Sequence, residues 1–313
     1  MGRRQPISRE DALAILRSPP AELPGILANT AALRHEKWGN RVTLCSITNA
    51  KSGACSEDCR FCAQSATHNT GIEVYPLHSP ARVRDAYDRA AELPIDHFGV
   101  VTSGETLDDS GVNTVCEAIR DHARPGKAWC ASLGSLSSAQ LAALKEAGLQ
   151  RFHHNLETAE SFFPEVCSTH TFADRIAALR RAREAGLETC AGGILGLGES
   201  LEQRVELALT LSGEQVDSIP LNFHVPIPGT PLEGIEPAKP LDALRAIAMF
   251  RMTNPEAEIK VCAGRCHLRD LQSMIFHAGA TGMMIGPLLT IAGRDVDDDL
   301  EMLRDLEMDF AVP

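Results

Sequence analysis

Residues 128–156 read AWCASLGSLSSAQLAALKEAGLQRFHHNL, and this stretch contains one complete strand–helix–strand repeat. The β-like runs Ala128–Leu133 and Arg151–Leu156 flank the segment SSAQLAALKEAG at 137–148. Apolar residues in that segment recur at three- and four-residue spacing, and the segment ends in glycine, which commonly stops a helix. The repeat predicts a strand, an amphipathic helix and a second strand parallel to the first.

The same alternation continues along most of the chain, with similar helical segments at 172–186, at 200–213 and near Asp297–Leu306. The β-like runs are Arg41–Ile47, His97–Ser103, Ala128–Leu133, Arg151–Leu156, Glu188–Leu195, Ser218–Val225, Glu258–Ala263 and Gly282–Ile285. Eight strands, each followed by a helix, predict a parallel (β/α)8 barrel, and the alternative is an open doubly wound sheet.

The first residues precede this alternation. Residues 8–39 have a helical pattern that is interrupted near Pro19, Pro20 and Pro24. We therefore expect a single domain, in which an N-terminal helical extension at 1–39 precedes the barrel at 40–313.

Composition narrows the classes of function. The chain of 313 residues has a formal net charge of -12, which disfavours binding to nucleic acid because phosphates would be repelled. It has no run of 18 apolar residues, so we expect no membrane span. The start, MGRRQPISRE, lacks the apolar segment of a secretory signal, so we expect a cytoplasmic protein.

The segment KSGACSEDCRFCAQS at 51–65 follows the first predicted strand and contains Cys55, Cys59 and Cys62 in the pattern C-x3-C-x2-C. Three closely spaced thiolates on one loop can bind three irons of a cubane cluster and leave the fourth iron open for catalysis. Structural zinc, the main alternative, usually needs four protein ligands, and no second pair stands nearby. The spacing therefore predicts an iron–sulfur cluster.

This loop resembles that of the radical S-adenosylmethionine (SAM) superfamily, and Phe61 before the third cysteine fits the same pattern. The resemblance implies that SAM binds the open iron of a 4Fe-4S cluster and is cleaved to a 5′-deoxyadenosyl radical. The cofactors then supply the chemistry, and the protein supplies orientation and exclusion of water.

Further stretches resemble the biotin synthase family over about residues 40–308. They are GACSEDCRFCAQSATHNTG (53–71), CASLGSLSSAQLAALKEAGL (130–149), FHHNLET (152–158), CAGGILGLGES (190–200), PLNFHVPIPGTPL (220–232) and VCAGR (261–265). The family resemblance implies an enzyme that inserts sulfur into dethiobiotin to form biotin, with a second, auxiliary iron–sulfur cluster as the sulfur source.

By resemblance, Cys130 and Cys190 are ligands of the auxiliary cluster. The chain departs from the better-known form of the family at two positions, because HFGVVTSGET at 97–106 has no cysteine and Lys260 stands where an arginine is usual. Cys262 faces the same way as Lys260, since side chains alternate along a strand. We expect Cys262 as a third ligand, with Cys45, Cys266 and Lys260 as further candidates. A four-iron cluster with an extra sulfide is one form such a set could hold.

The remaining cysteines are expected elsewhere. Cys116 lies in a helical segment and is expected in the core, whereas Cys167 follows the fourth strand and is left unassigned. The adjacent His153 and His154 receive no role, because one of two neighbours on a strand should face outward.

Resemblance also suggests residues for SAM and substrate. Glu157, where the family commonly has aspartate, would contact the SAM ribose, and Arg175 would pair with the SAM carboxylate. Gly193 and Gly196, within GGILGLGE at 192–199, would lie against adenine. The substrate residues would be Asn155 and Asn222 at the ureido ring, since an amide offers both donor and acceptor, and Thr290 at the carboxylate, beside Ile291.

Two other readings stay open at this point. One is another radical SAM enzyme on the same barrel, of the hydrogenase-maturation or methylornithine-synthase type. The other is a non-catalytic iron–sulfur carrier, which would leave the open iron without a purpose. The family also suggests flavodoxin or ferredoxin as electron donor, and a homodimer.

Overall fold

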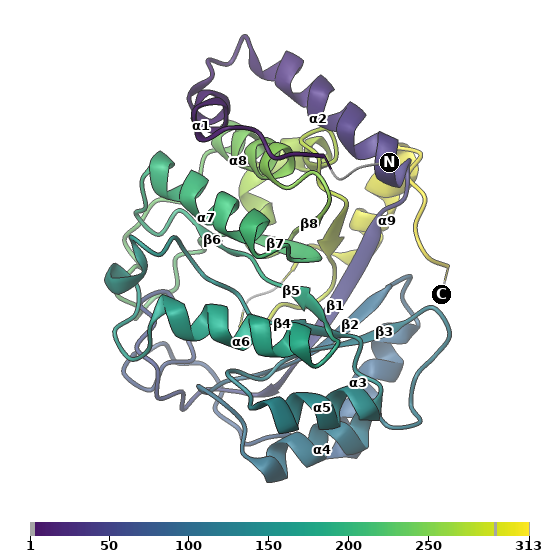
Figure 1. The fold of residues 1–313 in the computed structure, drawn as a ribbon. Helices are drawn as coiled ribbons and strands as arrows, with labels where there is room; N and C mark the ends of the chain where they lie inside the picture. The colour runs from purple at the N-terminus through teal and green to yellow at the C-terminus, as the bar shows by residue number, and fades with distance from the viewer. Residues whose placement is uncertain (1–3, 291–292, 313) are drawn as a thin grey trace.

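A computed structural model describes residues 4–290 and 293–312, so residues 1–3 of the predicted extension lie outside it. All paired strands run parallel, in the order β5-β4-β3-β2-β1-β9-β8-β7-β6, and β5 also pairs with β7 (Figure 1). That last pairing closes the ring. The strands are β1 (Thr43–Lys51), β2 (His97–Thr102), β3 (Ala128–Ser132), β4 (Arg151–His153), β5 (Glu188–Cys190), β6 (Gly193–Leu195), β7 (Ser218–Phe223), β8 (Glu258–Val261) and β9 (Gly282–Met284). The predicted (β/α)8 barrel is confirmed, and the open sheet is wrong.

The strand boundaries differ from the prediction in two informative places. β1 extends to Lys51, so the cysteine loop leaves the barrel directly from its first strand. The predicted fifth strand is split into β5 and β6 around Gly192, whose added Cβ would lie 1.9 Å from the Pro220 carbonyl oxygen. The Gly192 N–H donates to Asn155 Oδ1 at 3.1 Å, so a side chain replaces the backbone acceptor there. This exchange explains the break.

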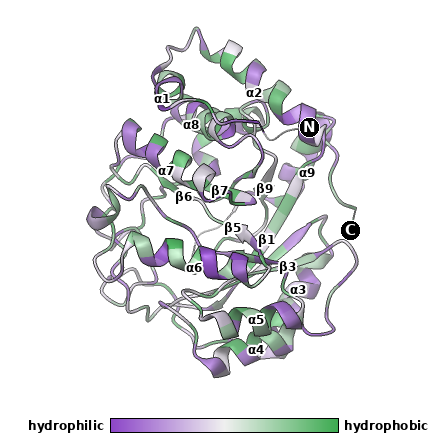
Figure 2. Ribbon diagram, in the orientation of Figure 1, coloured by the Kyte–Doolittle hydropathy of each residue, from purple (hydrophilic) through white to green (hydrophobic). Residues whose placement is uncertain are grey.

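Helices cover the outside of the barrel, and Figure 2 shows hydrophobic and hydrophilic residues interleaved along them. They are α1 (Arg9–Arg17), α2 (Leu23–Trp38), α3 (Pro80–Ala91), α4 (Asp109–Ile119), α5 (Ser138–Ala147), α6 (Phe172–Glu184), α7 (Leu201–Gly213), α8 (Pro240–Thr253) and α9 (Val296–Asp305). Among the described residues, no helix is long and apolar enough to cross a membrane.

The two N-terminal helices lie against α8 on the outside of the barrel (Figure 1). Their break falls at Ser18–Glu22, in line with Pro19 and Pro20, but Pro24 does not interrupt a helix as predicted. It stands in the first turn of α2. Proline is tolerated there because its missing N–H would have no intrahelical acceptor.

The segment after β8 departs from the simple strand–helix repeat. It is the 3-10 segment η2 (Arg265–Ile275), which starts after left-handed Gly264 and is kinked at Arg269, where φ is 51°. An added Cβ on Gly264 would lie 2.1 Å from the Phe223 carbonyl oxygen, so the close approach to β7 requires glycine. The mouth of the barrel therefore lacks a regular α-helix on this side.

A buried ion pair ties this segment to α9. Arg265 donates to both carboxylate oxygens of Asp299, at 2.9 and 2.5 Å, and the two residues are 5% and 0% exposed. The pair is bidentate, which is the stronger geometry for an arginine and a carboxylate. It fixes η2, and with it one side of the barrel mouth.

We expect Asp299→Asn to lower the free energy of unfolding by about 3 kcal/mol, because the change leaves the buried Arg265 charge without a full counter-charge. Urea denaturation followed by circular dichroism measures the change. Asp305→Asn, at an exposed position of the same helix, is the control and should stay within about 0.5 kcal/mol of the parent. Equal stability of all three proteins would contradict a stabilising role for the Arg265–Asp299 ion pair.

Candidate functional site

Two cavities meet at the carboxyl ends of the strands. The outer cavity, of about 350 Å³, is lined by the cysteine loop, and the inner cavity, of about 360 Å³, lies within the barrel. Six residues line both cavities: Phe61, Cys62, Ser132, His153, Asn155 and Glu157. A ligand in one cavity is therefore adjacent to a ligand in the other, at the end of the barrel where active sites of this architecture lie.

The structure brings Cys55, Cys59 and Cys62 together on the wall of the outer cavity. The loop folds back on itself, because Cys55 N–H donates to the Gln64 carbonyl at 3.1 Å and Ala66 N–H donates to the Cys55 carbonyl at 2.8 Å. Burial raises the pKa of Cys62 to about 11. This thiol therefore keeps its proton in the metal-free protein and would release it on binding a metal.

Glu157 follows β4 in a strained backbone conformation, with φ at 67°. Its carbonyl oxygen accepts a hydrogen bond from Ile194 N–H at 2.7 Å, next to Gly193, whose added Cβ would lie 2.5 Å from the same oxygen. Burial raises the pKa of the Glu157 carboxyl, although the Arg175 charge opposes the rise. Strain of this kind in a non-glycine residue is typical of functional sites.

The side chains beside Glu157 hold one another. Asn155 Oδ1 accepts from Gly192 N–H at 3.1 Å and lies 3.0 Å from His153 Nε2, while its Nδ2 donates to Glu157 Oε2 at 3.3 Å. Arg175, on α6, donates from Nη1 to the Asn155 carbonyl at 2.9 Å and lies 3.5 Å from Glu157 Oε1. The predicted residues Asn155, Glu157 and Arg175 therefore form one group.

The predicted glycines have a local role that the motif did not reveal. Gly193 is required by its contact with the Glu157 carbonyl, and the Gly196 N–H donates to Glu199 Oε1 at 2.7 Å. The loop after β6 is thus closed by a protein carboxylate.

The remaining predicted substrate residues also line the inner cavity. Asn222, on β7, accepts from Ala263 N–H at 3.1 Å and donates to the Gly193 carbonyl at 3.3 Å, which fixes its amide. Thr290 lines the same cavity. Ile291, its neighbour, lies outside the described residues.

Besides Cys62 of the cysteine loop, four cysteines line the inner cavity: Cys45, Cys130, Cys190 and Cys262. Burial raises the pKa of Cys130, Cys190 and Cys262, so these thiols are protonated when no metal is bound. Cys266, in contrast, is exposed at the start of η2 and is not part of this group. Cys116 is buried in the core, as predicted.

A group of charged side chains lies next to these cysteines. Lys260 Nζ donates to Cys45 Sγ at 3.3 Å and lies 3.2 Å from Glu258 Oε2, and Arg151 Nη1 lies 2.8 Å from the same oxygen. Burial alone would lower the pKa of Lys260, yet its contacts with the Cys45 sulfur and the Glu258 carboxylate raise it. Lys260 is therefore an ammonium ion.

Sequence reasoning missed Arg151, Glu258 and the neighbouring His97, all of which are mostly buried. The sequence did contain a signal for Arg151. It lies two residues before His153, which faces the cavity, and side chains two residues apart on a strand point the same way. Burial lowers the pKa of His97 to about 2, so its ring is neutral beside this charged group. The sequence also left Cys167 unassigned, and its sulfur lies 3.7 Å from that of Cys59.

Comparison with known proteins gives consistent results. Residues 50–211 match the radical SAM superfamily, and residues 220–309 match the biotin and thiamin synthesis associated domain. The chain is 50% identical to biotin synthase of Maridesulfovibrio salexigens, over 96% of this chain and 92% of that protein. It is 46% identical to biotin synthase of Trichlorobacter lovleyi, over 97% of this chain and 92% of that protein.

Solved structures share the fold at lower identity. Methylornithine synthase superimposes with a TM-score of 0.83 at 20% identity, covering 97% of this chain and 94% of that one. The FeFe-hydrogenase maturase HydG from Carboxydothermus hydrogenoformans gives a TM-score of 0.80 at 18% identity, covering 97% and 75%. These likenesses support the barrel but do not discriminate among the reactions it hosts.

Buried His153 predicts a pH dependence of stability. Burial lowers its pKa to about 4, against about 6.5 in an unfolded chain. Between about pH 7.5 and about pH 5.5 the unfolded chain gains this proton and the folded chain does not, so the free energy of unfolding should fall by about 1 kcal/mol from this group.

Chemical denaturation of the metal-free protein at both pH values measures the effect. His153→Gln should show a smaller fall than the parent, whereas His277→Gln, at an exposed position, should keep the parent's fall. An unchanged pH slope in His153→Gln would show that His153 does not stay neutral on folding.

Proposed function

The chain belongs to the biotin synthase family of radical SAM enzymes, and we propose that its two adjoining cavities bind different components needed for the conversion of dethiobiotin to biotin. The outer cavity would hold the 4Fe-4S cluster and SAM that family membership implies. The inner cavity would hold dethiobiotin above an auxiliary cluster. The observation that supports this division most directly is the shared wall of Asn155 and Glu157 between the two cavities.

The residues of the outer cavity suit the cluster and cofactor. We propose Cys55, Cys59 and Cys62 as its ligands, since three thiols on one short loop face a cavity that leaves room for a further ligand. When bound, the 4Fe-4S cluster and SAM would together supply the radical chemistry that activates the substrate. Arg175 offers a positive charge for the SAM carboxylate, and Glu157 an acceptor for ribose hydroxyls.

The shared wall would orient the substrate. Asn155 and Asn222 are both fixed by backbone hydrogen bonds, yet each amide keeps donor or acceptor capacity for a cyclic urea. Thr290 would bind the carboxylate from the same cavity. Gly193 would contribute to SAM binding indirectly, by allowing the backbone path that places Glu157. Gly196, whose N–H donates to Glu199, would shape the loop expected to lie against adenine.

The inner cavity suits an auxiliary cluster held by cysteine. We propose Cys45, Cys130, Cys190 and Cys262 as the ligand set, because all four line one cavity and Cys266 does not. This set supplies four thiolates even though residues 97–106, where the better-known form of the family has a cysteine, contain none. Four cysteine ligands can hold an iron–sulfur cluster of either two or four irons.

Lys260 has a different part in this proposal. An ammonium ion has no lone pair to give to iron, and Lys260 already pairs with Glu258 and Cys45. Lys260 would therefore donate a hydrogen bond to the Cys45 sulfur. Together with Arg151 it would offset the negative charge of the bound thiolates.

Two partners complete the proposal, and both rest on the family resemblance. A flavodoxin or ferredoxin would deliver the electron to the cluster in the outer cavity. Two copies of the chain would form a homodimer.

Anaerobically reconstituted protein, given SAM, a reductant and dethiobiotin, should yield both 5′-deoxyadenosine and biotin by mass spectrometry. Cys59→Ala should lose both products, because three ligands are needed to hold the cluster. 5′-Deoxyadenosine without biotin from iron-loaded parent protein would contradict the role of the inner cavity. Neither product would contradict the whole proposal.

The Cys190→Ala variant tests the role of the inner cavity separately from that of the outer cavity. We expect it to lose iron and to lower biotin formation by about 100-fold or more, since a ligand loss should exceed the effect of losing an outer-shell partner. It should still cleave SAM to 5′-deoxyadenosine. Cys116→Ala, which removes a buried core cysteine, should keep iron content and biotin formation. Unchanged iron content in Cys190→Ala would exclude it as a ligand.

A further inference from the structure

His170 lies between the cysteine loop and Arg175 on the wall of the outer cavity. Glu57, His170 and Arg175 all line this cavity. Arg175 Nε donates to His170 Nε2 at 3.0 Å, and the other ring nitrogen, Nδ1, is in hydrogen-bonding contact with Glu57 Oε2. The three side chains therefore form a continuous chain of hydrogen bonds from the cysteine loop to α6.

The direction of these hydrogen bonds follows from the arginine. A guanidinium can only donate, so His170 Nε2 accepts, and a ring that accepts at Nε2 carries its hydrogen at Nδ1. That hydrogen is directed at the Glu57 carboxylate. Glu57 is buried and also accepts from Thr169 Oγ1 at 2.5 Å, so its own position is fixed. The His170 ring is thus held in the orientation that presents an acceptor to Arg175.

One aromatic ring supports both His170 and Arg175. Phe163 begins the short 3-10 turn η1 (Phe163–Glu165) and is buried. Its centroid lies 5.5 Å from that of the His170 ring, which it meets at a steep angle, and 5.7 Å from the Arg175 guanidinium carbon. A cation at this distance from an aromatic ring is attracted to it. Packing on Phe163 therefore restricts both side chains further.

The hydrogen bonds of Arg175 leave one of its nitrogens available. Nε donates to His170, while Nη1 donates to the Asn155 carbonyl at 2.9 Å and lies 3.5 Å from Glu157 Oε1. Among the described residues, Nη2 has no hydrogen-bond partner. Because Arg175 lines the outer cavity, Nη2 is the nitrogen left for an anionic ligand there.

We propose that His170 is a positioning residue, which holds Arg175 so that Nη2 stays available to the carboxylate of SAM and thereby increases the affinity for SAM. The inference rests on the proposed role of Arg175 in SAM binding. A side chain that is already held in its bound orientation loses less entropy when the ligand arrives. Glu57 contributes by fixing the His170 ring.

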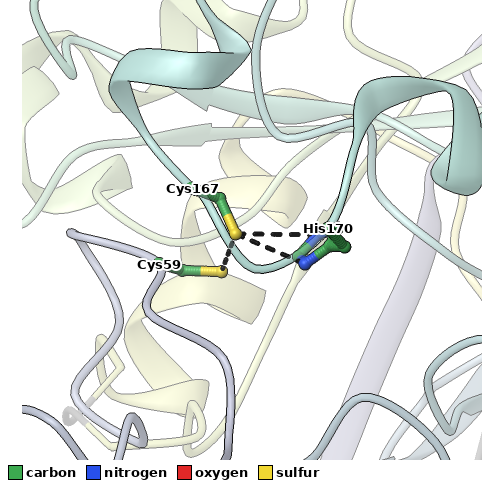
Figure 3. Close-up of side chains that lie close together, drawn as sticks. All are labelled: Cys59, Cys167 and His170. Atoms are coloured by element: carbon green, nitrogen blue, oxygen red, sulfur yellow. Dashed lines mark hydrogen bonds between the residues drawn. The ribbon is translucent and has the colours of Figure 1, made fainter.

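A metal ion is one competing use of His170. The ligand atoms of Cys59, Cys167 and His170 all lie within 4.8 Å of one another, and Figure 3 shows the His170 ring beside Cys167. A metal at Nδ1 would displace the hydrogen bond to Glu57, and a metal at Nε2 would displace the one from Arg175. Such a site would also remove Cys59 from the three-cysteine loop. We therefore assign the ring to Arg175.

Direct contact between His170 and SAM is a second competing use, because His170 itself lines the outer cavity. Both ring nitrogens are already engaged, by Arg175 and by Glu57. A double variant separates the two possibilities. If His170 acts through Arg175, removing both side chains should weaken SAM binding no more than removing Arg175 alone, whereas independent contacts would add.

The test measures the dissociation constant of SAM and the iron content of anaerobically reconstituted protein, with radiolabelled SAM in equilibrium dialysis. His170→Leu and His170→Ala both lack an acceptor for Arg175, and Leu keeps more of the side-chain volume. Each should raise the dissociation constant about tenfold, as for the loss of one hydrogen bond to a charged group. His170→Gln, whose side-chain oxygen can accept from Arg175, should lie nearer the parent.

Three further proteins complete the comparison. Arg175→Ala should bind SAM more weakly than the parent, and the double variant His170→Ala/Arg175→Ala should match Arg175→Ala. His277→Ala, which changes an exposed histidine outside the cavity, should match the parent. All variants should keep the parent's iron content, because none of them changes a proposed iron ligand.

Every other outcome decides against one of the claims. The parent's SAM affinity in both His170→Leu and His170→Ala, no recovery in His170→Gln, or a double variant weaker than Arg175→Ala would each overturn the positioning role. Loss of iron or of a bound zinc ion from the His170 variants would overturn it in favour of a metal site. Unchanged SAM affinity in Arg175→Ala would instead contradict the proposed function, so the two failures are distinguishable.

Discussion

The two cavities depend on one backbone contact, in which the Glu157 carbonyl accepts from Ile194 N–H beside the bare Cα of Gly193. A side chain at Gly193 would push β6 away from the end of β4. The contact holds Glu157 in its left-handed conformation and so directs its carboxylate to the wall that both cavities share. Strain in Glu157 is tolerated because Asn155, Arg175 and the neighbouring strand together determine its position.

Charge governs the inner cavity in a similar way. A low-polarity barrel interior disfavours isolated charges, yet this one contains Arg151, Lys260 and Glu258. These charges are compatible with burial because Glu258 forms an ion pair with Arg151 and another with Lys260. The same cations lie near the cysteines, where bound thiolates would add negative charge. The cavity is thus suited electrostatically to an anionic cluster.

Fold and reaction are specified by different parts of the molecule. Methylornithine synthase and a hydrogenase maturase share this barrel at 20% and 18% identity, so the arrangement of strands does not select a chemistry. The relatives that share close to half of the sequence are biotin synthases. The choice of reaction must therefore rest on side chains that enter the barrel, and in this chain these include interior cysteines, Asn155 and Asn222.

Local sequence patterns were sufficient to predict the features that depend on the order of neighbouring residues. Alternating strand and helix patterns predicted the barrel, and the spacing of Cys55, Cys59 and Cys62 predicted a cluster loop, because each pattern lies within a few residues of chain. Four features became visible only in the folded chain: the split of β5 from β6, the position of Cys266 outside the inner cavity, the Arg151–Glu258–Lys260 group and the contact of Cys59 with Cys167. These features join residues from different strands and loops, as in the case of Cys59 and Cys167, which are 108 positions apart. Barrel closure sets which of them meet, and no local pattern encodes that distance.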